Sequence, residues 1–192
     1  PWHEARNHFS GPVASALERV LVHDGSRQML GRLLLWHGLP GTGKTSAILS
    51  LTYEWREWCS AHTILDPERF FGNPSYMAEV VSSGQPYEWK LIIAEDCDQY
   101  LAPPPGSGVG GSLGQLLNLT DGLLGQGSNT LVLLTTNAPI QRVHPALIRP
   151  GRCLSNIQFT KLTSAEAARL TGNPAAPSMT LAEAYQSLAS GE

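Results

Sequence analysis

Eight consecutive residues have the types and spacing needed to hold phosphate groups. They run Gly38-Leu39-Pro40-Gly41-Thr42-Gly43-Lys44-Thr45 and match GxxxxGK[ST] in full. The glycines let the backbone fold into a ring whose N–H groups point inward at phosphate oxygens. Lys44 adds a positive charge, and the hydroxyl of Thr45 can bind Mg²⁺. We therefore expect a nucleotide site built from this loop, formed by Pro40, Gly41, Thr42, Gly43, Lys44, Thr45 and Ser46.

Two adjacent carboxylates, Glu95 and Asp96, could complete this chemistry. They directly follow the apolar run Leu91 to Ala94, which predicts a strand buried on both faces of a sheet. At such a strand end, enzymes with a phosphate loop hold Mg²⁺ and polarise the attacking water. We expect the metal to bind at Thr45, Glu95 and Asp96. The alternative is a solvated acidic turn with no catalytic role.

A parallel sheet would bring these residues together. The phosphate loop follows the apolar run Leu33 to Trp36, and apolar residues at 47, 48, 51, 55 and 59 predict a helix after it, with its positive end on the phosphates. Further strands are predicted at 61–65, 91–94 and 131–134. Helices are predicted from Gly11, from Asn73-Pro74 to about Val81, and over a segment marked by Leu113, Leu116, Leu117 and Leu124. Strands that alternate with helices indicate an α/β fold with a parallel sheet and helices on both faces.

The pattern changes after Phe159. Thr163 to Glu166 and Thr180 to Glu183 are both capping boxes, and Gly172-Asn173-Pro174 ends the first of two short helices. We therefore divide the chain into a nucleotide-binding α/β domain at 1–160 and a short or truncated helical lid at 161–192. Residues 103–111 are too poor in side chains to pack, and we expect a mobile loop there rather than a domain linker.

Composition excludes some partners and leaves others open. The chain has 192 residues and a net charge of −3, which gives no basic field for nucleic acid. No apolar run approaches the ~18 residues of a membrane-spanning helix. The three cysteines, Cys59, Cys97 and Cys153, lack metal-site spacing and are expected to be reduced packing residues, as in the cytoplasm. Because the sequence begins at Pro1, targeting signals can lie outside it.

One more segment carries a family resemblance. Residues 131–139, continuing through 144–152, resemble the second region of homology in the AAA branch of the AAA+ ATPases. Together with the phosphate loop, the acidic strand end and Leu117 to Gly122, the similarity runs from about residue 31 to 160, with four motifs in the family's order. The order Glu95-Asp96-Cys97-Asp98 and the segment Ile148 to Arg152 are similar to the mitochondrial AAA chaperones that assemble the Rieske protein.

This resemblance implies roles for three further residues. Asn137 matches the sensor residue that holds the attacking water near the γ-phosphate. Arg149 and Arg152 match arginine fingers, which reach the nucleotide site of a neighbouring subunit and neutralise charge on the transferred phosphoryl group. The alternative is that both arginines pair with surface carboxylates. His37 and His144 are expected to be structural.

The chain departs from the family in two places. Most members have Asp-Glu where this chain has Glu95-Asp96, so by position Glu95 takes the metal side and Asp96 the water side. We expect hydrolysis to survive the exchange; whether it slows, and whether Asp98 takes part, stay open. Arg169 is the only arginine after Arg152, and no lid role is assigned to it.

Phe70-Phe71-Gly72 falls where AAA motors carry an aromatic pore loop that grips polypeptide. The alternative is that the two rings pack in the core or form a hydrophobic staple before a helix.

These features predict a Mg²⁺-dependent ATP hydrolase that assembles into a ring, as a hexamer, with arginine fingers in trans and a protein client. The alternative is a nucleotide-dependent assembly switch with slow or no turnover. A nucleic-acid motor is the third possibility, disfavoured by the acidic balance. The sequence identifies neither the client nor any flanking domain.

Overall fold

The computed structural model describes residues 1–25, 31–83, 88–102, 111–121, 129–149 and 151–190. Five strands form one parallel sheet in the order β2-β3-β4-β1-β5. The expected α/β parallel-sheet fold is therefore confirmed. The strands are β1 (Leu33–Gly38), β2 (Cys59–Thr63), β3 (Trp89–Ala94), β4 (Thr130–Thr136) and β5 (Cys153–Phe159).

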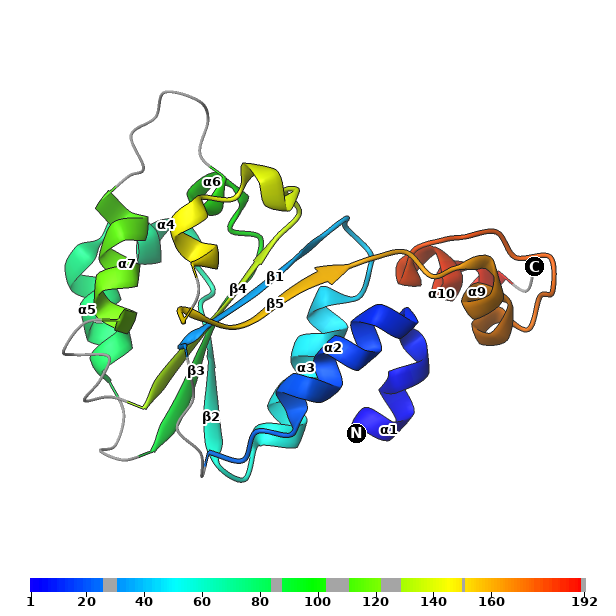
Figure 1. The fold of residues 1–192 in the computed structure, drawn as a ribbon, viewed down its shortest axis with the longest axis horizontal. Helices are drawn as coiled ribbons and strands as arrows, with labels where there is room; N and C mark the ends of the chain where they lie inside the picture. Colours follow the sequence, from blue (N-terminus) through cyan, green and yellow to red (C-terminus); the bar gives the residue numbers. More distant parts are fainter. Residues whose placement is uncertain (26–30, 84–87, 103–110, 122–128, 150, 191–192) are drawn as a thin grey trace.

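Helices cover both faces of the sheet, as Figure 1 shows. Alternate residues of β1 point to opposite faces, so Leu34 and Trp36 pack in one core and Leu33 and Leu35 in the other. One face carries α1 (Trp2–Ala5), α2 (Gly11–Leu21) and α3 (Lys44–Trp55), and the other carries α4 (Pro67–Gly72), α5 (Pro74–Ser82) and α7 (Gly111–Asp121). Short helical turns fill the connections: η1 (Arg6–His8), α6 (Asp98–Leu101), η2 (Ile140–Arg142) and η3 (Pro145–Ile148).

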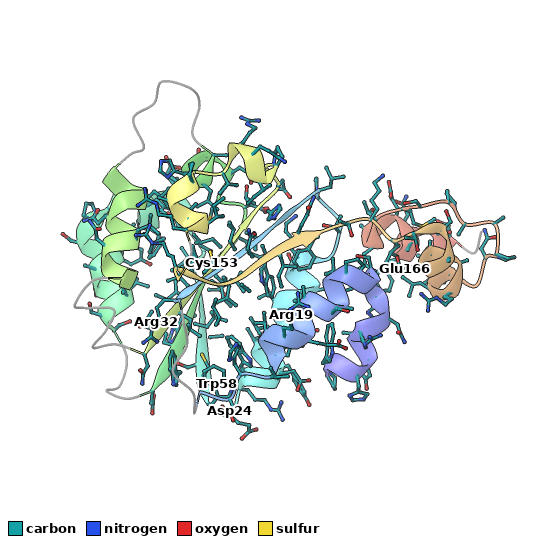
Figure 2. The ribbon with its side chains drawn as sticks, in the orientation of Figure 1. Arg19, Asp24, Arg32, Trp58, Cys153 and Glu166 are labelled. Atoms are coloured by element: carbon teal, nitrogen blue, oxygen red, sulfur yellow. The ribbon has the colours of Figure 1, made fainter. Side chains whose placement is uncertain are left out.

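Two short helices follow β5, as predicted: α9 (Ser164–Thr171) and α10 (Leu181–Ser190). They share a small core of their own, formed by Leu162, Ala167, Ala176 and Ala184. In the first capping box Glu166, labelled in Figure 2, accepts hydrogen bonds from the backbone and hydroxyl of Thr163, at 2.8 and 2.9 Å. Its second oxygen accepts the Gly11 N–H at 2.7 Å, which ties α9 to the start of α2. The division into domains at residue 160 stays a prediction.

Two elements end at other residues than the sequence predicted. The helix after the phosphate loop ends at Trp55 rather than Cys59, because Cys59 already pairs with Trp89 as the first residue of β2. That strand accordingly ends at Thr63, two residues before its expected end. Strand β5 and helix α4 had no sequence prediction.

Helix α4 contradicts the pore-loop expectation for Phe70, Phe71 and Gly72. The Asp66 side chain caps the helix by accepting the Arg69 N–H at 2.9 Å, so all three residues are helical. The side chains of Phe70 and Phe71 are only 0% and 1% exposed, and the Phe71 ring stacks on Tyr100 with centroids 4.3 Å apart. Rings buried in this way cannot grip a client, and the alternative of core packing is correct.

Other expectations meet the structure only in part. Residues 103–110 of the expected mobile loop, and Gly122 and Leu124, lie outside the described residues. Where the structure describes the chain, none of its helices is long and apolar enough to cross a membrane. Cys59 and Cys97 are buried and Cys153 is half-buried, and none of the three is in a disulfide bond within the described residues.

Candidate nucleotide site

The phosphate loop connects β1 to α3 and lines a cavity of about 340 Å³. Gly43, the last loop residue, has a φ of +99°, and a Cβ atom there would lie 2.9 Å from both Leu181 and Phe9. Only glycine fits this close approach. The cavity is lined by Pro40, Gly41, Gly43, Lys44, Thr45, Ser46, Glu95, Asp96, Asn137, Leu181, Ala182 and Tyr185.

Thr42 is the one expected loop residue outside this lining. Its side chain is buried, and its hydroxyl donates a hydrogen bond of 2.7 Å to the carbonyl oxygen of Leu39. Thr42 therefore stabilises the bend of the loop rather than facing the cavity.

The Lys44 ammonium group sits at the centre of the site. The residue is 8% exposed, and its Nζ donates to the Gly38 and Leu39 carbonyls at 2.8 and 3.2 Å and to Asn137 Oδ1 at 2.8 Å. Burial lowers the pKa of Lys44, and the charges of Asp96, Asp98 and Glu95 oppose that shift. The nearby carboxylates thus favour the charged form of this buried lysine.

The two adjacent carboxylates face different partners. Glu95 Oε2 accepts a hydrogen bond of 2.6 Å from the Thr45 hydroxyl, next to the first turn of α3. Asp96 Oδ1 accepts a longer bond of 3.2 Å from Asn137 Nδ2, at the end of β4. Asp96 has a φ of +53°, the only positive φ of a non-glycine residue in the described ranges. This backbone turn separates the two side chains.

Asn137 connects the phosphate loop to the acidic end of β3. Its side-chain oxygen contacts Lys44 and its side-chain nitrogen contacts Asp96, while its own N–H donates to Asp98 Oδ1 at 3.0 Å. Asp98 does not line the cavity, and its carboxylate accepts the backbone N–H of Asn137 instead.

Arg149 and Arg152 lie apart from this cavity, on the segment between η3 and β5. Arg149 is exposed, and its guanidinium makes no ion pair or hydrogen bond with any residue that the structure describes. Arg152 is half-buried, and its Nη1 donates to the Ala146 carbonyl at 2.7 Å. The two arginines therefore differ in what they are free to reach.

Helix α10 supplies part of the cavity wall that sequence reasoning missed. The Ala182 N–H donates a hydrogen bond of 3.0 Å to the Gly41 carbonyl, so the helix begins directly on the phosphate loop. The Tyr185 hydroxyl lies 3.0 Å from His8 Nδ1, which joins α10 to the segment before α2. The Thr180 capping box indicated where α10 begins, but no local pattern relates it to the loop.

His37 and His144 both have structural roles. His37 is buried in β1, and burial, followed by the charge of Lys44, lowers its pKa, which favours the neutral ring. His144 caps η3 by accepting the Ala146 N–H at 3.2 Å.

The donors present suit Mg²⁺. No group of three or more His, Cys, Asp and Glu side chains that could hold a metal occurs within the described ranges. Mg²⁺ in nucleotide enzymes is usually bound by one or two carboxylates together with substrate phosphates and water, and needs no such cluster. Thr45 and Glu95, already 2.6 Å apart, offer hard oxygen ligands beside the loop.

Comparison with known proteins agrees with this geometry. Residues 34–161 match the sequence model of one family, described as the ATPase family associated with various cellular activities (AAA). The matched stretch contains the phosphate loop, both carboxylates, Asn137 and the two arginines. A search of curated proteins finds no match to the chain.

Proposed function

Because the chain belongs to the ATPase family associated with various cellular activities, it is an ATP hydrolase, and we propose that it acts as a Mg²⁺-dependent subunit of a ring that remodels a protein client. Members of this family are usually oligomeric. A hexameric ring and a protein client are our proposals for this chain. The client proposal is supported by the family and by a net charge of −3, which offers no basic field for nucleic acid.

One observation carries the hydrolytic site: Lys44, Asn137 and Asp96 form a continuous hydrogen-bonded chain along the cavity, with bonds of 2.8 and 3.2 Å. Lys44 would place its charge against the phosphates. Asn137 would orient the attacking water, and Asp96 beside it would accept the proton of that water. Asp96 and Asn137 line the cavity from just beyond the ends of β3 and β4, and Lys44 lines it from the start of α3.

In the same cavity, Thr45 and Glu95 would hold Mg²⁺. When bound, this ion neutralises the charge of the phosphate oxygens. The hydrogen bond between these two residues supports Glu95 in the metal-side role and leaves Asp96 for the water. The exchanged order of the two carboxylates is therefore compatible with the usual roles, in which the first residue lies near the metal and the second near the water.

We propose that Arg149 is the arginine finger. Its exposed guanidinium has no partner among the described residues and does not face its own cavity, as a group meant for a neighbouring subunit requires. Arg152 was an equal candidate from the sequence. Its bond to the Ala146 carbonyl supports a different role, in which it holds the segment that presents Arg149.

The closer similarity to the Rieske-assembly chaperones rests on residues 95–98 and 148–152 alone. We keep it as a proposal about which members of the family this chain resembles most, and it identifies no client. No gripping residue is assigned, because Phe70 and Phe71 are buried.

The second candidate function is an assembly switch with slow turnover. It is favoured by the shorter reach of Asp96, whose carboxylate has one methylene fewer than the glutamate usual at that position. In this case nucleotide would hold subunits together without steady hydrolysis.

The test is ATP hydrolysis per subunit measured over a range of protein concentrations, with Arg149→Ala beside the wild type. A composite site between subunits predicts a rate that climbs with concentration and collapses in the variant. Arg142→Ala, which removes an exposed arginine of η2, is the matched control and should hydrolyse normally. Nucleotide-dependent oligomers with negligible turnover would favour the switch. A rate that is independent of concentration and unaffected by Arg149→Ala would refute the arginine-finger proposal.

A further inference from the structure

The chain leaving β3 and the chain leaving β4 are tied together beyond the end of their strand pairing. The ladder between the two strands ends at the pair Ala94 and Leu134. Past it, Thr135 accepts the Asp96 N–H on its hydroxyl and the Cys97 N–H on its carbonyl, both at 2.9 Å. In the opposite direction, Asp98 Oδ1 accepts the Asn137 N–H at 3.0 Å.

The bond from Asn137 to Asp98 is the one that fixes the position of the sensor side chain. Asn137 follows the last residue of β4, so its N–H has no strand partner in the sheet. A backbone N–H that loses its partner must find water or move. A carboxylate acceptor gives a hydrogen bond about twice as strong as a neutral one. Asp98 therefore anchors the backbone from which the Asn137 amide extends.

Small movements of this backbone would matter, because the Asn137 amide spans two contacts at once. Its oxygen is 2.8 Å from Lys44 Nζ and its nitrogen is 3.2 Å from Asp96 Oδ1. A shift of about 1 Å breaks contacts of this length, and displacements of that size can cost about a hundredfold in rate.

We infer that Asp98 is a positioning residue for ATP hydrolysis, whose carboxylate holds the main chain of Asn137 so that its amide stays between Lys44 and Asp96. Asp98 does not line the cavity; apart from the charge that it contributes near Lys44, it acts through Asn137. The inference rests on the proposed function, since it assumes that Asn137 orients the attacking water.

The experiment compares Asp98→Ala with Asp98→Asn. The alanine variant loses the acceptor, and its kcat should fall roughly 10- to 100-fold while KM for ATP stays within about twofold, because the phosphate contacts are untouched. The asparagine variant keeps a side-chain carbonyl that can accept the same N–H, and should stay within about threefold of wild-type kcat. Rescue by asparagine separates the hydrogen bond from the charge of Asp98.

The matched control is Asp66→Ala. Asp66 accepts a backbone N–H from Arg69 at 2.9 Å, as Asp98 does from Asn137, but it caps α4 away from the cavity. This variant should leave kcat unchanged. If Asp98→Ala does not fold, Asp98→Glu provides the test, because it keeps the charge and moves the acceptor by one methylene; its kcat should also fall at unchanged KM.

A second readout does not need turnover. Amide hydrogen exchange at Asn137 should accelerate in Asp98→Ala and stay near the wild-type rate in Asp98→Asn. Normal kcat in Asp98→Ala, unchanged exchange, or an asparagine variant as slow as alanine would each overturn the positioning role. If the wild type hydrolyses no ATP at any concentration, the proposed function fails instead, and the exchange comparison still decides whether Asp98 holds Asn137.

Discussion

Lys44 Nζ and Asn137 Oδ1 are joined by a hydrogen bond of 2.8 Å, which links the phosphate loop directly to the end of β4. The lysine side chain is thereby held toward the end of β4. Because β1 and β4 are adjacent parallel strands, their carboxyl ends meet at one edge of the sheet and bring these residues together.

Asn137→Ala should separate binding from chemistry. The variant removes the amide that contacts Lys44 and Asp96, so kcat should fall roughly 10- to 100-fold. Nucleotide affinity should change little, since the loop backbone and Lys44 remain. Steady-state hydrolysis and titration with a fluorescent nucleotide measure the two quantities. Asn73→Ala, which removes the cap of α5, is the control, and equal kcat in all three proteins would exclude a role for Asn137.

Gly43→Ala should damage both the fold and the nucleotide site. At a φ of +99°, the added Cβ would lie 2.9 Å from Leu181 and Phe9, so α10 and the segment before α2 would have to move. We expect a loss of about 1–3 kcal/mol in the free energy of unfolding. Nucleotide affinity should fall by about tenfold, which corresponds to ~1.4 kcal/mol.

Denaturant unfolding with and without nucleotide measures both effects of Gly43→Ala. Gly114→Ala is the matched control, because a Cβ at this helical position meets nothing within 4 Å. Alanine there should stabilise the protein by about 0.5–1 kcal/mol. A Gly43→Ala protein of wild-type stability and affinity would contradict the close packing on the loop.

Phe71→Ala should destabilise the protein rather than disable a client-binding surface. Its ring is 1% exposed, and removal of a buried phenylalanine side chain costs about 3–5 kcal/mol. Chemical denaturation measures the loss. Leu65→Ala, at a residue that is 93% exposed, should stay within about 0.5 kcal/mol of wild type. Normal stability combined with lost client processing would bring the pore-loop interpretation back.

Glu166→Gln should alter stability in a pH-dependent way. Burial alone would raise the pKa of Glu166, but hydrogen bonds from Thr163 and Gly11 and the charge of Arg169 lower it. Because the folded pKa lies below the unfolded value, the carboxylate stabilises the fold above about pH 4.3. That contribution is lost as the pH falls through the folded pKa. The variant should be less stable by about 1 kcal/mol at pH 7, and the difference should shrink in acid.

Urea unfolding of Glu166→Gln at neutral and acidic pH follows this difference. Glu57→Gln is the control, since its carboxylate is exposed and, among the described residues, pairs with the neighbouring Arg56 at 3.3 Å. A difference from wild type that stays constant between pH 7 and pH 3 would show that the charge of Glu166 is not involved.

The sequence predicted those parts of the site that depend on local pattern. The phosphate loop has its own spacing, β3 and β4 are continuous apolar runs, and Asn73 caps α5 as expected. Strand β5 was missed because Cys153 to Phe159 includes Ser155, Asn156 and Gln158, and its assignment comes from pairing with β1 rather than from local preference.

The remaining parts of the site depend on tertiary contacts. Leu181, Ala182 and Tyr185 reach the cavity only because α10 begins on the Gly41 carbonyl. The bond from Asn137 to Asp98 likewise exists only once β3 and β4 lie side by side. For Phe70 and Phe71 the tertiary contacts overturned a sequence prediction. Their place in the order of the family motifs suggested an exposed loop, but both rings pack in the core.

The position of β1 in the sheet has a consequence for folding. Its neighbours are β4 and β5, so Leu33 pairs with Val132 on one side and Cys153 on the other. During synthesis on the ribosome, β1 and the phosphate loop are made well before β4 and β5, the two strands that pair with β1. Pairings between such distant segments are slow to form. We therefore expect ATP binding to appear late and abruptly during synthesis, only after β5 has left the exit tunnel, and nascent chains that stop at Asn129 should not retain nucleotide.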